Sequence, residues 1–200
     1  MERKSQPSLA ARDLLHARLE AMFSESTDGV LAFDADGTLW SGDVGEDVFH
    51  LAVKSEMLLE PAREELARIA EQYQLSSAGS PSQIALRLFD AYLSGIYPER
   101  DVCSMMSWCY AGWSLDDLRR HARRAFAETH LAGRLFLGFE SVFEQARKRG
   151  IRALVVSASP QTVVEEAAAH WDVRPEDIIA CRPATEGDRI LPALAAPVPY

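Results

Sequence analysis

Residues 30–40 read Val-Leu-Ala-Phe-Asp-Ala-Asp-Gly-Thr-Leu-Trp. An apolar run of four residues ends in two aspartates, Asp34 and Asp36, and a glycine and a threonine follow at once. Such a run before a polar turn predicts a buried strand. Open parallel α/β sheets bind ligands at the carboxyl ends of their strands. Two acids beside a hydroxyl at that place suit a site that binds a divalent cation and transfers a phosphoryl group.

The composition is that of a soluble globular protein. Its 200 residues suffice for one domain with a sizeable insertion or for two small domains. The net charge of −9, without an extended run of lysine or arginine, argues against a nucleic-acid partner. The polar start resembles no signal peptide, and no apolar run is long enough to cross a bilayer. Three cysteines without paired-ligand spacing fit a reducing compartment. We expect a cytoplasmic protein without membrane contact, in an oligomeric state left open.

Hydrophobic periodicity predicts an α/β alternation with a helical insertion after the first strand. A packing helix at Ser8–Phe23 comes before that strand. The insertion contains four predicted helices, at 58–73, 82–94, 99–110 and 115–129, the last capped by Ser114 with Asp117 three residues on. The pattern then predicts a helix at Phe139–Arg149, a buried strand at Ile151–Val156, another helix after Ser157–Pro160, a short strand at Asp177–Cys181 and a hairpin turn at Gly187-Asp188.

The residues at the ends of the two buried strands can be given chemical roles. Asp34 can attack phosphorus as a carboxylate nucleophile, and Asp36 can protonate the leaving alcohol and then deprotonate water. Mg²⁺ would relieve the repulsion between these acids and a phosphate. Thr38 and Ser157 supply hydroxyl donors, Ser157 also precedes a helix whose amino end favours an anion, and Gly37 permits a tight turn.

Simpler interpretations exist for each signal. Asp-x-Asp-Gly is common in ordinary turns, and Ser157 alone could cap a strand end. A calcium loop does not fit, because the glycine comes two positions early and the twelfth position is Gly45 instead of glutamate. The two signals together, in this order, favour the phosphate site.

Asp34-Ala35-Asp36-Gly37-Thr38-Leu39 and Ser157-Ala158-Ser159 resemble motifs I and II of the haloacid dehalogenase-like hydrolase superfamily, and within it the phosphoserine phosphatase-like branch. The resemblance implies a Rossmann-like core and a helical cap that closes over the active site. It also implies Mg²⁺-dependent hydrolysis of a small phosphorylated metabolite through an aspartyl-phosphate. Asp34 and the backbone carbonyl of Asp36 would hold the metal, and Ala158 would join the phosphate-binding groups. Asp36 favours a phosphatase over a dehalogenase.

The resemblance predicts a discontinuous core of residues 1–44 and 133–200 and a cap of residues 45–132. The family also uses a lysine and an acidic pair after motif II, whereas the lysines of this chain are Lys4, Lys54 and Lys148. We therefore expect the carboxyl-terminal part of the core to be missing and the chain to be a fragment. A non-catalytic phosphate-binding or interaction protein on the same fold is the alternative.

Two further residues, one just before the predicted cap and one within it, are candidates for substrate contact by the same resemblance. Asp43 lies nine residues after Asp34, where that branch places a substrate-facing acid. Arg87, on a predicted cap helix, is placed like an arginine that meets a substrate carboxylate. A solvated loop acid and a helix-surface arginine are the ordinary alternatives.

Overall fold

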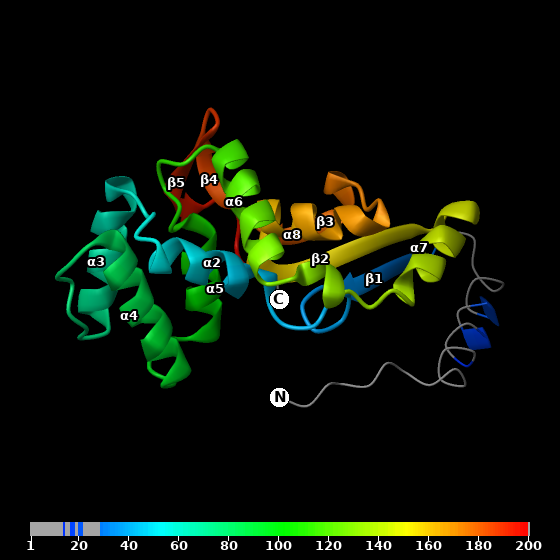
Figure 1. Cartoon of the computed structure of the whole chain (residues 1–200), viewed down its shortest axis with the longest axis horizontal. Coiled ribbons are helices and arrows are strands. Elements are labelled where there is room, and N and C mark those ends of the chain that lie inside the picture. Colours follow the sequence, from blue (N-terminus) through cyan, green and yellow to red (C-terminus); the bar gives the residue numbers. More distant parts are fainter. Residues whose placement is uncertain (1–13, 15–16, 19, 22–28, 200) are drawn as a thin grey trace.

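A computed structural model describes residues 29–199, together with residues 14, 17–18 and 20–21. Most of the helix predicted at Ser8–Phe23 therefore lies outside the described residues. Within the described part, helices alternate with parallel strands, which confirms the predicted α/β class (Figure 1).

The described parallel sheet has three strands in the order β1-β2-β3. These are β1 (Val30–Asp34), β2 (Arg152–Pro160) and β3 (Ile178–Cys181). All three were predicted, and β2 runs four residues further than the apolar pattern indicated. The register pairs Asp34 with Val156, so that the polar residues that follow these two positions begin at the same edge of the sheet.

The chain from Val44 to Glu128, after the first strand, is helical, as predicted. Its helices are α2 (Val44–Lys54), a 3₁₀ turn (Glu60–Ala62), α3 (Arg63–Gln72), α4 (Pro81–Leu93), α5 (Glu99–Trp108) and α6 (Leu115–Glu128). A capping box joins Ser114 to Asp117 at the start of α6, which confirms that prediction. Helix α2 was not predicted as a separate helix.

The remaining elements follow the predicted alternation. They are a 3₁₀ turn (Leu131–Gly133), α7 (Phe139–Lys148), α8 (Gln161–Ala168), 3₁₀ turns at Ala169–Trp171 and Pro175–Asp177, and the antiparallel strands β4 (Pro183–Glu186) and β5 (Arg189–Leu194). The turn of this hairpin is at Gly187-Asp188, as predicted.

Strand β1 is covered on one face. The ring of Phe33 packs against Phe139 and Phe143 of α7, with centroid separations of 5.7 and 4.9 Å. On the alternate face Val30 is 55% exposed, and Ala32 and Asp34 are exposed as well. The sequence of β1 is typical of a central strand buried on both faces, but in the described sheet only β2 pairs with it.

The hairpin joins the helical segment through backbone hydrogen bonds. Gly112 donates to the carbonyl of Ile190, and Ile190 donates to the carbonyl of Trp113, both at 2.9 Å. One buried hydrophobic cluster extends from the sheet into the helices. The division into a core and a cap at residues 45–132 stays a prediction. None of the helices described here has both the length and the apolar character needed to cross a membrane.

Candidate active site

The turn after β1 is fixed by backbone hydrogen bonds. The carbonyl of Ala35 accepts from the N–H groups of Thr38 and Leu39, and the N–H of Gly37 donates to the carbonyl of Trp40. Gly37 has φ +79°, a conformation that glycine adopts without steric cost. Because its N–H is already bonded, Gly37 serves the site through the shape of the turn.

Asp34 is the exposed acid of the pair. It ends β1 with its side chain open to solvent, and the hydroxyl of Thr38 donates to Asp34 Oδ2 at 3.0 Å. An ionised carboxylate has lone pairs for about four hydrogen bonds. Asp34 is therefore placed to meet a molecule that arrives from solvent.

Asp36 is the anchored acid. Its Oδ1 accepts from the indole N–H of Trp40 at 2.7 Å and from the backbone N–H of Val44 at 2.9 Å. Its Oδ2 accepts from the hydroxyls of Ser157 at 3.1 Å and Ser159 at 2.9 Å. The two motifs, more than a hundred residues apart, thus meet at one carboxylate, and four donors fix its orientation.

Asp43 connects this cluster to the first helix of the insertion. It is the N-cap of α2, where its side chain accepts from the N–H of Glu46 at 2.8 Å, and Ser159 Oγ lies 3.3 Å from its Oδ1. Burial, followed by the negative charge of Asp36, raises the pKa of Asp43 from its ordinary 3.8 to about 7. A hydroxyl has one hydrogen to donate. Since Ser159 donates to Asp36, its contact with Asp43 is strongest when Asp43 is protonated.

The acids gathered here make the site electronegative. Burial also raises the pKa of Glu46, with the neighbouring charges of Asp47 and Asp36 adding to it. Carboxylate and carbonyl oxygens are the ligands that Mg²⁺ prefers, and Mg²⁺ is commonly held by one or two carboxylates plus substrate phosphate and water. The donor set at Asp34 and Asp36 fits that chemistry, although the described residues include no cluster of three His, Cys, Asp or Glu side chains arranged around a metal.

Arg87 is not brought to this cluster by any described contact. Its guanidinium, on α4, donates to the backbone carbonyls of Ser76 and Ala78. This arginine therefore fixes the loop that leads into its own helix, and its contact with a substrate stays a prediction.

Two residues of the cluster were not predicted to have these roles. Ser159 bridges Asp36 and Asp43, and Trp40 holds Asp36 through its indole. A signal for Ser159 was present, because residues two apart on a strand share a face and Ser157 was already a candidate. No local pattern links Trp40 to Asp36, since their contact depends on the folded turn.

Solved structures of low sequence identity share the fold. A protein of unknown function from Bordetella pertussis Tohama I is 20% identical, with 86% of this chain and 69% of that chain covered and a TM-score of 0.57. A functionally unknown protein from Anaerococcus prevotii DSM 20548 is 13% identical, with 90% and 71% covered and a TM-score of 0.56.

A third structure is a phosphoserine phosphohydrolase-like protein from Francisella tularensis subsp. tularensis SCHU S4. It is 13% identical, with 83% of this chain and 64% of that chain covered and a TM-score of 0.44. The chain thus spans about two thirds of the length of these proteins.

No curated protein matches the sequence. A family model described as haloacid dehalogenase-like hydrolase matches residues 31–197, from the first strand to just past the hairpin. The match includes both polar turns that meet at Asp36. The chain therefore belongs to the haloacid dehalogenase-like hydrolase family.

Proposed function

We propose that the protein is an Mg²⁺-dependent phosphatase that hydrolyses a small phosphomonoester through an aspartyl-phosphate on Asp34. The observation that carries the proposal is the contact of the hydroxyls of Ser157 and Ser159 with Asp36, two residues beyond the exposed Asp34. This contact supports a single site formed by both motifs. The family's description as hydrolases agrees with it.

In the proposed reaction the carboxylate of Asp34 attacks phosphorus, and the bond between phosphorus and the alcohol oxygen breaks. Asp36 gives a proton to the departing alcohol, which leaves the phosphoryl group on Asp34 as an acyl phosphate. Water then attacks that phosphorus and gives its proton to Asp36. Inorganic phosphate leaves, and the carboxylate of Asp34 is restored.

The arrangement of Asp36 bears on these proton transfers. Both carboxylate oxygens of Asp36 accept hydrogen bonds. A carboxylate arranged in this way can accept a proton, as the second step requires. The protonated form needed in the first step can keep its serine partner, because a hydroxyl that donates in one state can turn and accept in the other.

The remaining groups are assigned by their positions. The hydroxyls of Thr38 and Ser157 and the backbone N–H of Ala158 would bind phosphate oxygens, beside the turn at Gly37. The carboxylate of Asp34 and the backbone carbonyl of Asp36 would hold Mg²⁺, which when bound offsets the negative charge of the acids and the phosphate. Asp43, at the rim of the same cluster, would contact a polar group of the substrate.

A non-catalytic phosphate-binding or interaction protein is the second candidate. The observation that favours it is the same set of four donors at Asp36, because a purely structural aspartate is also held in this way. Such a protein would bind an inert phosphate analogue at the motif site without turnover.

Turnover of an aryl phosphate with and without Mg²⁺ separates the two candidates. A phosphatase hydrolyses it only with Mg²⁺ and loses at least about a thousandfold in kcat on Asp34→Asn, as expected when a nucleophile is removed. Asp116→Asn, an exposed acid at the start of α6, is the matched control and keeps full activity. Turnover that survives Asp34→Asn would remove Asp34 from its proposed role.

A further inference from the structure

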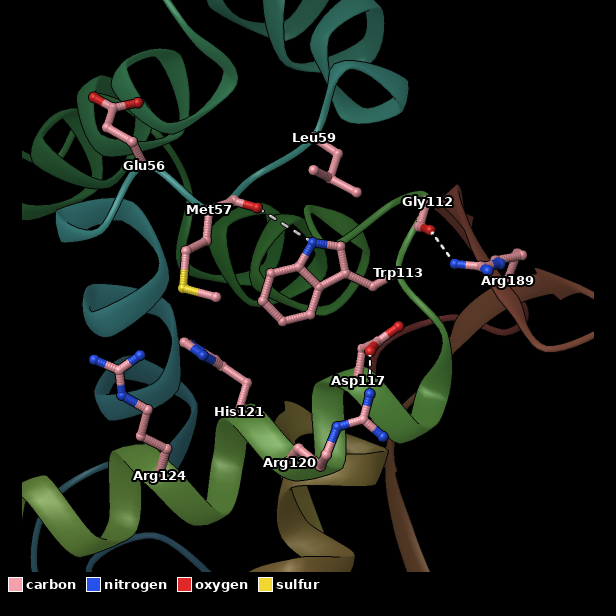
Figure 2. A pocket seen from close by; sticks show the side chains of 10 residues that line it. All are labelled: Glu56, Met57, Leu59, Gly112, Trp113, Asp117, Arg120, His121, Arg124 and Arg189. Carbon is pink, nitrogen blue, oxygen red and sulfur yellow. Dashed lines mark hydrogen bonds and ion pairs between the residues drawn. The ribbon is translucent and has the colours of Figure 1, made fainter.

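The helical segment contains a groove of about 500 Å³ that is separate from the motif site (Figure 2). Its walls come from the chain just after α2, the turn before α6, one face of α6 and the start of β5. None of the polar residues assigned to the motif site lines it. Its volume lies within the range of about 300–1,000 Å³ typical of small-molecule sites.

The floor of the groove is apolar and its polar atoms already have partners. The indole N–H of Trp113 donates to the carbonyl of Met57 at 3.3 Å. His121 packs edge-on against Trp113 with ring centroids 5.2 Å apart, and its Nε2 lies 3.1 Å from the carbonyl of Val48. Burial lowers the pKa of His121, which favours the neutral ring. Figure 2 shows Met57, Trp113 and His121 side by side at the centre of the groove.

Three arginines surround this floor. Arg120 and Arg124 are four residues apart on α6, and Figure 2 shows their guanidinium groups on either side of His121. Arg189 reaches in from β5 and donates to the carbonyl of Gly112 at 3.0 Å. Their side chains are 67%, 57% and 60% exposed, respectively. Three cations thus line one cavity in a chain whose net charge is −9.

Each of the three arginines forms an ion pair with a neighbouring acid: Arg120 with Asp117, Arg124 with Glu128 and Arg189 with Asp188. Asp117 accepts from the N–H and hydroxyl of Ser114 in the capping box. The carboxylate of Glu56 points away from the indole in Figure 2 and accepts from the hydroxyl of Ser80. The surface ion pairs of the arginines with neighbouring acids contribute little, so the anion of a ligand can compete for them.

We propose that this groove binds a small organic anion, a carboxylate or a phosphate, carried on a flat apolar ring. The ring lies against Met57 and Trp113, and the anion lies between the guanidinium groups of Arg120 and Arg124, with Arg189 at the far side. Charge-assisted hydrogen bonds from planar guanidinium groups suit both carboxylate and phosphate oxygens. The site is independent of the phosphatase function proposed above.

Titration followed by ¹H–¹⁵N NMR tests the site. The probe set is naphthoate, naphthylphosphonate (which cannot be hydrolysed), neutral naphthol and inorganic phosphate alone. The indole N–H resonance of Trp113, assigned by its loss in Trp113→Phe, shifts saturably with one or both ring-bearing anions. The stronger of the two anions identifies the headgroup. Equal binding of naphthol, or no saturable shift with either ring-bearing anion, would overturn the proposal.

Variants on neighbouring positions of α6 provide the matched control. Arg120→Gln and Arg124→Gln each weaken binding about three- to tenfold, as expected for the loss of one charge-assisted hydrogen bond at an exposed site. Arg123→Gln leaves it unchanged, because Arg123 pairs with Glu166 of α8 and does not line the groove. An equal loss of binding affinity in all three variants would contradict the proposed site. Ligand-induced chemical-shift changes centred on residues 34–38 would contradict it as well. Far-ultraviolet circular dichroism checks that each variant is folded.

Discussion

Gly45 lies so close to Ser159 that a β-carbon on Gly45 would be 2.7 Å from Ser159 Oγ. The same β-carbon would lie 3.1 Å from Asp43 Oδ1 and from Cδ of Pro160. The first turn of α2 thus packs directly on the end of β2. This close approach lets the N–H of Val44, from α2, and the hydroxyl of Ser159, from β2, bind the same carboxylate of Asp36.

Gly45→Ala is therefore expected to destabilise the protein, although alanine is the better helix former by about 1 kcal/mol. The added methyl forces the hydroxyl of Ser159 away from Asp36, and overpacking of this kind costs about 1–3 kcal/mol. Urea denaturation measures the change. Gly133→Ala, where nothing lies within 4 Å of the new β-carbon, is the control. A rise in the free energy of unfolding of Gly45→Ala would show that the two segments are not in contact.

The raised pKa of Asp43 predicts a pH dependence of stability. The folded protein keeps this proton up to about pH 7, whereas the unfolded chain loses it near 3.8. Between these values the folded state binds more protons than the unfolded state. The contribution of Asp43 to the free energy of unfolding therefore falls as pH rises from about 4 to about 7, and it stays low above that.

Asp43→Asn isolates this contribution, because asparagine stays neutral and remains a good N-cap. We expect the variant to gain stability over the wild type as pH rises from about 4 to about 7, measured by urea denaturation without divalent cations. Asp116→Asn, an acid-to-amide change at the start of α6, serves as control. The raised pKa of Asp43 would be contradicted if the difference in the free energy of unfolding between the wild type and Asp43→Asn did not change with pH.

The two aspartates of the motif should differ in their effects on stability. Asp36→Ala leaves the four donors around this carboxylate without their acceptor, which costs about 2–4 kcal/mol. Asp34→Ala removes an exposed side chain that accepts from Thr38, and changes stability by about 0.5 kcal/mol or less. Thermal or urea unfolding of both variants makes the comparison. Equal losses would mean that Asp36 is not anchored as described.

The capping box of α6 should contribute measurably to stability. Ser114→Ala removes the side chain that accepts from the N–H of Asp117 at 3.0 Å, and N-cap losses of this kind cost about 1 kcal/mol. Ser80→Ala, at the equivalent box of α4, should lose a similar amount. Unchanged unfolding midpoints in both variants would contradict the capping assignment.

The strands and helices with clear periodicity could be predicted from the sequence. The runs before Asp34 and before Ser157 are apolar, so both strands were predicted, although Ser157–Pro160, expected to close the second strand, is part of β2. Helix α2 was not separated from its surroundings. Its start is marked by the N-cap contact of Asp43 and by packing on Ser159. The packing on Ser159 is a tertiary feature, whereas the N-cap at Asp43, with Glu46 and Asp47 in the first turn, is a local signal that could have marked the start of the helix.

The candidate site was predicted in part. Asp34, Asp36 and Ser157 were predicted to lie together because each follows or ends an apolar strand. Parallel strands place their carboxyl ends at one edge of the sheet. The contact of Trp40 with Asp36 and the bridge made by Ser159 require the three-dimensional turn. The high pKa of Asp43 depends on burial, which a helix cap does not reveal in the sequence.

The most direct test of the proposed function is to find where the phosphoryl group goes. The protein is mixed with an aryl phosphate and Mg²⁺, quenched in acid, reduced with borohydride and mapped by peptide mass spectrometry. Borohydride converts an aspartyl-phosphate to homoserine, and we predict homoserine at position 34 alone. Turnover with an unmodified Asp34, with homoserine at position 36, or with phosphoserine at position 157 would contradict the account.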